Sequence, residues 1–358
     1  MEGKCRVYGG MRGIMIYFNC DYHEGAHERI LEALMKTNRE QTTGYGMDPY
    51  CLEAAELLKK QCGREDVDVH FLVGGTQTNL TVIASALRPH QGILAAETAH
   101  IQVHETGAIE SCGHKVLPLL SKDGKLTADQ VKEAYLAHKT EPTAEHMVQP
   151  KMVYISNPTE LGTLYSREEL QSLHEGCTDC HLILYMDGAR LGYGLEAEGN
   201  TLDLPCIADC CDVFYIGGTK VGALFGEAVV IRNPAIKEDF RYIMKQKGAL
   251  LAKGRLLGIQ FAELFRDGLY FELSAHADRM ADRLRAAFRG KGYAFFVENT
   301  TNQIFPIVPN GHLEELKKEF SFEYQTKVEE THTAVRFCTS WATREEHVDR
   351  LVEKLRQL

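Results

Sequence analysis

A glycine-rich run, GGTQTN (Gly74–Asn79), is the first segment whose residues could do chemistry. It separates a predicted strand from a predicted helix, and the free N–H groups of a helix N-terminus bind anions. Gly75 would let the backbone come close to a phosphate, and Thr76 adds a hydroxyl. The run matches neither the P-loop nor the dinucleotide-binding fingerprint. It could also be a plain tight turn between strand and helix.

An acidic residue, Asp187, ends the apolar segment LILYMD, where open α/β sheets bind their ligands. A carboxylate at this position could keep a pyridinium nitrogen protonated, which makes the ring an electron sink. Arg190 follows three residues later and could reach a carboxylate or a ring hydroxyl oxygen. Asp187 could equally be the N-cap of the next helix.

A lysine, Lys220, lies in IGGTKVGALFG, directly after another predicted strand. The surrounding glycines would let the loop bend tightly and expose the ammonium group. A lysine at a cationic or desolvated site loses its proton easily and attacks aldehydes, although most lysines are solvated surface residues. The order of the three features favours a functional lysine over a surface one, because one pyridoxal 5′-phosphate (PLP) needs a phosphate cup, a strand-end acid and a loop lysine. We therefore predict that Lys220 holds PLP as a Schiff base.

The elements that must position these residues follow an alternating pattern. Short apolar segments alternate with helical ones up to Asn233, which predicts an α/β fold with a mainly parallel, seven-stranded sheet and helices on both faces. The predicted strands are residues 67–73, 92–96, 115–120, 152–156, 181–187, 213–217 and 228–233.

The pattern changes after Asn233, and a smaller C-terminal α+β domain is predicted. Its elements are helices at 236–247, 256–287 and 344–358 and strands at 292–298, 301–308 and 334–340. We predict an irregular N-terminal extension (1–17), a large PLP-binding domain (18–250) and a small domain (251–358).

Composition excludes several classes of function. The formal charge of the 358 residues is -10, which argues against nucleic-acid binding and favours a small-molecule substrate. No apolar run approaches the ~20 residues that cross a bilayer. Eleven scattered cysteines and no export signal indicate a reduced, cytoplasmic protein.

A metal site is not expected. Cys177-x-x-Cys180 and the group at Cys206, Cys210 and Cys211 could suggest zinc, but buried apolar cysteine is the simpler interpretation. His100 and His104 could also bind a metal, but no third ligand is placed nearby.

Seven motifs in order resemble the threonine aldolase / β-eliminating lyase group of fold-type I PLP enzymes, from about Phe18 to the end of the chain. They are YGMDPY (45–50), GGTQTN (74–79), TAHIQVHETGA (98–108), YMDGARL (185–191), GGTKVGALFG (217–226), TNQIFPI (301–307) and TAVRFCTSW (333–341).

The resemblance implies a role for each matching residue. Gly75 and Thr76 would bind the phosphate, His100 would stack on the ring, and Thr219 would join the cofactor site beside Lys220. Asp187 would contact the ring nitrogen. Arg190 and Arg336 would hold the substrate carboxylate, although Arg336, an arginine in an apolar strand, could instead form an internal salt bridge.

The implied reaction is cleavage of the Cα–Cβ bond of a β-hydroxy-L-amino acid, such as threonine or allo-threonine, to glycine and an aldehyde. His100, His104 or a bound water is the candidate base for the β-hydroxyl proton. Family members usually carry Arg-Ser-Asp near the N-terminus, whose serine contacts the substrate carboxylate. Here the run is Asn19-Cys20-Asp21, so Cys20 takes the position of that serine and the contact is altered.

Other outcomes remain open at this stage. The chain could be a PLP-dependent β-eliminating lyase, a racemase or a transaminase for another amino acid, or a regulator that has lost the chemistry. The resemblance also implies a homodimer or homotetramer with shared active sites. The YGMDPY loop and a basic residue within 247–255 are the candidates to reach a neighbouring subunit.

Overall fold

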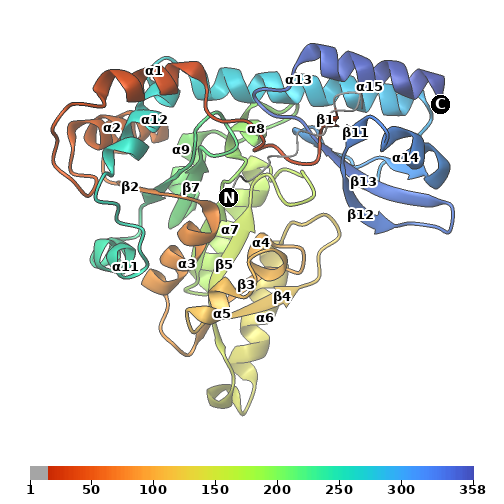
Figure 1. Ribbon diagram of the computed structural model, residues 1–358. Helices are drawn as coiled ribbons and strands as arrows, with labels where there is room; N and C mark the ends of the chain where they lie inside the picture. The colour runs from red at the N-terminus through yellow and green to blue at the C-terminus, as the bar shows by residue number, and fades with distance from the viewer. Residues whose placement is uncertain (1–14) are drawn as a thin grey trace, which may run out of the picture.

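A seven-stranded sheet forms the centre of the protein in the computed structural model, which describes residues 15–358 (Figure 1). The strands follow the order β2 (Asp68–Leu72), β8 (Glu227–Ile231), β7 (Val213–Gly217), β6 (Ile183–Asp187), β5 (Gln149–Ser156), β3 (Gln91–Ala96) and β4 (Lys115–Leu119). Strand β8 runs antiparallel to β2 and β7, and the other neighbours are parallel. The predicted fold class is confirmed.

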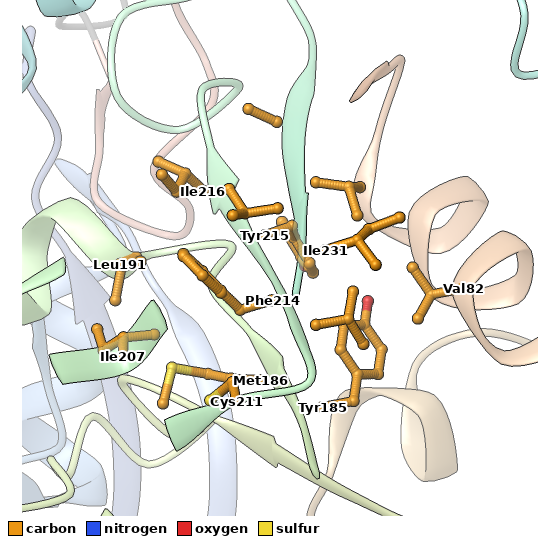
Figure 2. Packing of buried hydrophobic residues seen from close by; sticks show 14 of the residues in the cluster. Val82, Tyr185, Met186, Leu191, Ile207, Cys211, Phe214, Tyr215, Ile216 and Ile231 are labelled. Carbon is orange, nitrogen blue, oxygen red and sulfur yellow. The ribbon is translucent and has the colours of Figure 1, made fainter. Parts of the chain in front are cut away.

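The central strands are buried on both faces, as their continuous apolar runs predict. Every residue of β3, β7 and β8 is buried. Figure 2 shows Val82 of α3 (Gly75–Ala86) on one side of the β7–β8 pair. Leu191 of α8 (Leu191–Glu196) and Ile207 of α9 (Leu204–Cys210) lie on the other side.

Local sequence signals fix several helix starts. Helix α6 (Ala128–Thr140) begins with a capping box of Thr127 and Gln130, and α7 (Arg167–Asp179) with one of Ser166 and Glu169. Two further helices of the large core, α1 (Glu28–Thr37) and α2 (Pro49–Cys62), contact α12 (Arg255–Arg266).

A second hydrophobic core lies at the C-terminal end of the chain, packed around α13 (Leu269–Gly290) and α15 (Glu345–Gln357). Its antiparallel sheet contains β10 (Ile307–Pro309), β13 (His332–Cys338) and β12 (Glu323–Lys327), and β9 (Gln303–Ile304) also pairs with β13. The first core includes residues up to Ala277, so α13 contributes to both cores. The predicted division at residue 250 stays a prediction.

Several element boundaries differ from those predicted. The helix predicted for 256–287 is interrupted at Gly268, whose φ of +79° ends α12 and precedes α13. The helix predicted for 236–247 is divided into α10 (Pro234–Lys237) and α11 (Phe240–Gln246). The strand predicted for 292–298 makes a single bridge, between Phe295 and Pro306.

Other short elements carried weaker sequence signals. Helix α4 (His100–Val103) and helix α5 (Ala108–Ser111) are separated because Thr106 and Gly107 have positive φ. Helix α14 (Asn310–Leu316) and a parallel pair of two-residue strands, β1 (Ile16–Tyr17) and β11 (Phe320–Ser321), were not predicted. Of the predicted extension 1–17, only residues 15–17 are described, and Ile16 and Tyr17 form β1.

Candidate active site

Asp187 is a buried acid at the carboxyl end of β6, as predicted. Its Oδ1 accepts hydrogen bonds from Tyr215 Oη (2.6 Å) and the Ala189 amide (2.9 Å). Its Oδ2 accepts from Tyr154 Oη (2.5 Å) and Asn79 Nδ2 (3.2 Å). Four donors converge on this carboxylate, so its position and its acceptor role are fixed by β5, β6, β7 and α3 together.

A second buried network connects the sheet to His100. Tyr185 Oη donates to Asn79 Oδ1 (2.6 Å), and Asn79 Nδ2 also donates to Glu105 Oε1 (2.7 Å). The same Glu105 oxygen lies 2.8 Å from His100 Nδ1. Burial lowers the pKa of His100, but the Glu105 hydrogen bond and nearby carboxylates outweigh it, so the pKa lies above its ordinary value. His100 therefore holds a proton more firmly than an ordinary histidine does.

His104 lies beside His100 in a different environment. The two ring centroids are 5.6 Å apart, and the His104 side chain is exposed. Partial burial and the neighbouring His100 outweigh the carboxylate of Glu160 and lower the pKa of His104 below its ordinary value. The pKa values of the two histidines are therefore shifted in opposite directions, that of His100 upward and that of His104 downward.

The glycine run predicted to bind a phosphate forms the turn from β2 into α3. The N-cap residue is Gly74, and no side chain caps the helix. A Cβ on Gly75 would lie 3.2 Å from Tyr215 Oη, so the backbone approaches the Asp187 network closely. The helix N-terminus therefore keeps the capacity to bind an anion.

Lys220 lies in the tight loop between β7 and β8. The amides of Gly218 and Thr219 both donate to Gly226 O, at 2.9 and 3.2 Å, and Tyr193 Oη donates to Lys220 O. Burial and the positive charge of Arg190 lower the pKa of Lys220. The loop thus presents a lysine that gives up its proton more easily than a surface lysine.

Arg190, the N-cap residue of α8, forms a buried ion pair with Asp21. Arg190 Nε lies 2.7 Å from Asp21 Oδ2, and Asn302 Nδ2 donates to the same oxygen at 2.9 Å. Burial raises the pKa of Asp21, but the charges of Arg190 and Lys220 outweigh it and lower the pKa to about 2. Because Asp21 engages the guanidinium group, Arg190 is less available to a substrate than predicted.

The guanidinium group of Arg336, on β13, has hydrogen-bond donors that residues 15–358 do not fully use. Its Nη2 donates to Asn19 O at 3.3 Å, while its Nε is buried and has no partner within the described residues. Cys20 follows Asn19 directly, and burial raises the pKa of its thiol. The alternative of an internal salt bridge is not realised for Arg336 in the described part of the chain.

Sequence reasoning did not identify several residues of this site. Their signals were weak, since a tyrosine in a buried strand is typical of any core and Glu105 lies in a loop. The missed residues are Asp21, Asn79, Glu105, Tyr154, Tyr185 and Tyr215. Three of them lie in the motifs, Asn79 in GGTQTN, Glu105 in TAHIQVHETGA and Tyr185 in YMDGARL, and Asp21 ends the Asn19-Cys20-Asp21 run. The place of Asn79 in the first turns of α3 could have indicated a role.

The cysteine groups do not form a metal cluster in the part of the chain that the structure describes. The ten cysteines within residues 15–358 are free thiols, and seven of them lie in the large core. Within the same range, no group of three or more His, Cys, Asp or Glu side chains could hold a metal ion.

Comparisons with known proteins agree on one family. The family model of the β-eliminating lyases matches residues 21–310. The low specificity L-threonine aldolase of Pseudomonas sp. (strain NCIMB 10558) is 31% identical over 344 residues, which cover 95% of this chain and 96% of that protein. The low specificity L-threonine aldolase of Escherichia coli (strain K12) is 29% identical over 63% of this chain and 67% of that protein.

Solved structures are similar as well. The Leishmania major threonine aldolase superposes with a TM-score of 0.93 at 44% identity, covering 96% of this chain and 99% of that one. An aspartate aminotransferase from Thermus thermophilus superposes with a TM-score of 0.70 at 15% identity over 96% and 92% of the two chains, which shows a shared fold.

Proposed function

The chain belongs to the β-eliminating lyase family, and from this premise we propose that it is a PLP-dependent threonine aldolase. It cleaves the Cα–Cβ bond of a β-hydroxy-L-amino acid, converting threonine or allo-threonine to glycine and acetaldehyde. The observation that carries the proposal is the half-buried Lys220, whose pKa is lowered by desolvation and by the charge of Arg190, in the same site as the strand-end acid Asp187. The named relatives are threonine aldolases, which favours this reaction over β-elimination, racemisation or transamination.

The residues present fit the cofactor PLP. The uncapped N-terminus of α3, with Gly75 and Thr76, supplies amides for the phosphate. The Thr219 hydroxyl is bonded to Glu227 Oε1 and to the Gly226 amide, so we propose that Thr219 holds the loop beside Lys220 in place. Asp187 is the acceptor for the ring nitrogen, and of its four donors Asn79 is the most distant and the easiest to replace. His100 would cover the ring, and Lys220 would bind the aldehyde. When bound, PLP takes up the electron pair of the broken bond.

Arg336 is our candidate for the substrate carboxylate. Its unpartnered Nε and its Nη2 could form a two-point contact with a carboxylate. We propose that Arg190, held by Asp21, contributes mainly positive charge and that Cys20 lines the same end of the site. Fixing the carboxylate determines which bond at Cα is aligned for cleavage.

We propose His104 as the base that takes the β-hydroxyl proton. Its lowered pKa keeps the imidazole neutral near pH 7, whereas the raised pKa of His100 favours a positively charged ring bonded to Glu105. A neutral imidazole nitrogen can accept a proton, and a protonated one cannot.

Product analysis tests the proposed function. The purified chain with PLP is incubated with L-threonine, L-allo-threonine and L-serine, and glycine, aldehydes and keto acids are measured. Glycine and acetaldehyde are expected from the first two substrates, and Lys220→Ala should abolish both products. Keto acid without glycine from every substrate would contradict an aldolase.

A second copy of the chain is our proposed partner. Large apolar side chains are exposed on α1, the following loop and α2, and they include Met35 (81% exposed), Met47 (52%) and Leu52 (54%). Such side chains are typical of protein interfaces. We propose a homodimer or homotetramer in which this surface is covered, with Tyr45 of the loop directed to a neighbouring site. Light scattering measures the mass of the protein in solution. The mass of a dimer or tetramer is expected, and the mass of a monomer would contradict the proposal.

We also propose a cytoplasmic location. The ten described cysteines are free thiols, which suits a reducing compartment. No helix within residues 15–358 is long and apolar enough to span a membrane. Imaging of a tagged chain in its own cells tests this proposal.

A further inference from the structure

Glu227, the first residue of β8, is a buried acid that the reaction described above does not use. It is paired with Gly217 at the end of β7 and with Leu72 at the end of β2. Lys220 follows Gly217 within three residues, and α3 begins three residues after Leu72. Glu227 therefore lies between the lysine loop and the turn whose amides we assign to the phosphate.

The hydrogen bonds of Glu227 are incomplete. Its Oε1 accepts from Thr219 Oγ1 at 3.1 Å, and the Thr219 hydroxyl in turn accepts from the Gly226 amide at 3.0 Å. Its Oε2 is buried and has no partner among residues 15–358. Buried polar atoms without partners are rare, so this oxygen marks a place where a ligand atom can complete the site.

The groups around Glu227 come from four elements. Lys220 of the loop and Asp187 of β6 act on Glu227 through their charges, and Glu227 in turn raises the pKa values of Tyr185 (β6), Tyr215 (β7) and Tyr270 (α13). Burial raises the pKa of Glu227 to about 8, although Lys220 and Thr219 oppose the rise. At neutral pH the side chain is therefore mainly a carboxylic acid, and a carboxylic acid can donate a hydrogen bond.

We propose that Glu227 is a cofactor-binding residue whose protonated carboxyl group donates a hydrogen bond from Oε2 to the phosphate of PLP. This inference rests on the proposed function. An ionised carboxylate beside a phosphate dianion would repel it, whereas the acid, held by Thr219, completes the cup formed by the α3 amides. As a result, the site loses affinity for the phosphate when Glu227 ionises.

Cofactor binding as a function of pH tests this role. The dissociation constant of PLP is measured on the apoprotein by equilibrium dialysis between about pH 7 and about pH 9.5. Wild-type affinity should fall about tenfold for each pH unit above about 8, because binding requires one proton that the free protein has lost. In Glu227→Gln the amide donates at every pH, so the affinity of this variant relative to wild type should rise by the same factor.

The matched control is Glu196→Gln. Glu196 is an exposed acid at the end of α8, desolvation of its carboxyl group also raises its pKa, and it is not part of the site. It should follow the wild-type profile. Because the charge of Lys220 acts on Glu227, the Gln variant also changes the titration of Lys220, and the comparison of PLP with pyridoxal below separates the two contributions. Parallel profiles for wild type and Glu227→Gln would overturn the inference.

A measurement on the wild-type chain alone covers the case in which Glu227→Gln does not fold. Pyridoxal has the aldehyde but lacks the phosphate, and the second ionisation of the phosphate, near pH ~6, is complete by pH ~8. The ratio of PLP affinity to pyridoxal affinity should fall about tenfold per pH unit above about 8. If the affinities for PLP and for pyridoxal depend on pH in the same way, the dependence comes from Lys220. A contact between Glu227 and the phosphate is then ruled out, and the inference is overturned.

The role of Glu227 and the proposed function would fail in different ways. If the wild-type chain cleaves L-threonine with PLP but the profiles are parallel, only the role of Glu227 fails. If the chain binds no PLP at Lys220, shown by borohydride reduction and peptide mapping, the proposed function fails first.

Discussion

Arg190 and Asp21 form a buried ion pair with two hydrogen bonds, Arg190 Nε to Oδ2 at 2.7 Å and Nη2 to Oδ1 at 3.0 Å. The two residues are 169 positions apart in the chain. Asn302, from the C-terminal part, donates to the same carboxylate, and the charge of Lys220 acts on it as well. The pair therefore connects three distant segments around the lysine.

Asp21→Asn is expected to destabilise the protein. The amide keeps the shape of the side chain but leaves the Arg190 guanidinium group buried without a counter-charge, and breaking such a pair costs about 3–5 kcal/mol. Urea unfolding near neutral pH measures the loss. The control is Asp66→Asn, which removes an exposed partner of Arg64 and should leave the unfolding midpoint nearly unchanged. Equal losses in the two variants would contradict a special role for the buried pair.

The stabilising effect of Asp21 should depend on pH in a defined direction. The pKa of Asp21 is lowered from 3.8 to about 2 in the folded protein, so its contribution is complete above pH ~4 and is lost as the pH falls toward ~2. The shift corresponds to about 2 kcal/mol. The difference in free energy of unfolding between wild type and Asp21→Asn should therefore narrow over this interval. A difference independent of pH would contradict the assignment.

Tyr215→Phe is expected to slow the reaction more than it weakens binding of the amino acid. The variant removes the 2.6 Å hydrogen bond to Asp187 Oδ1 and leaves the acid less firmly held under the ring nitrogen. Loss of a hydrogen bond to a charged group costs about 1.5–3 kcal/mol, or roughly 10- to 100-fold in kcat. The control, Tyr165→Phe, removes a buried hydroxyl that accepts from the Leu126 amide outside the site. Similar kcat losses in both would indicate a general packing effect.

The main attachment points of the site were predictable from sequence because each is a local signal. Asp187 ends an apolar strand, Lys220 lies in a glycine loop, and Gly75 begins a helix after a strand. The partners of these residues were not predictable, because they are set by strand order. Tyr154 and Tyr215 reach Asp187 only because β5 and β7 flank β6, and that order is a property of the folded sheet. Alternation of strands and helices gave the α/β class but not the neighbours.

Arg336→Lys should raise KM for L-threonine by about 100-fold with a smaller effect on kcat. An ammonium group cannot form the planar two-point contact that a guanidinium group offers to a carboxylate. PLP affinity should be unchanged, which a spectroscopic titration measures separately. The control is Arg344→Lys, an exposed arginine at the start of α15. An unchanged KM in Arg336→Lys would mean that another group holds the substrate carboxylate.

His104→Gln is expected to lower kcat by about 10²- to 10⁴-fold, the usual contribution of a positioned base. Because the pKa of His104 is lowered, wild-type kcat should be flat above pH ~6.5 and fall at lower pH, as the imidazole becomes protonated. The Gln variant should lose this acidic limb, whereas a merely structural change would preserve it. His146→Gln, in a short helix outside the site, is the control. If His104→Gln keeps kcat within about twofold and retains the limb, a bound water or His100 takes the proton instead.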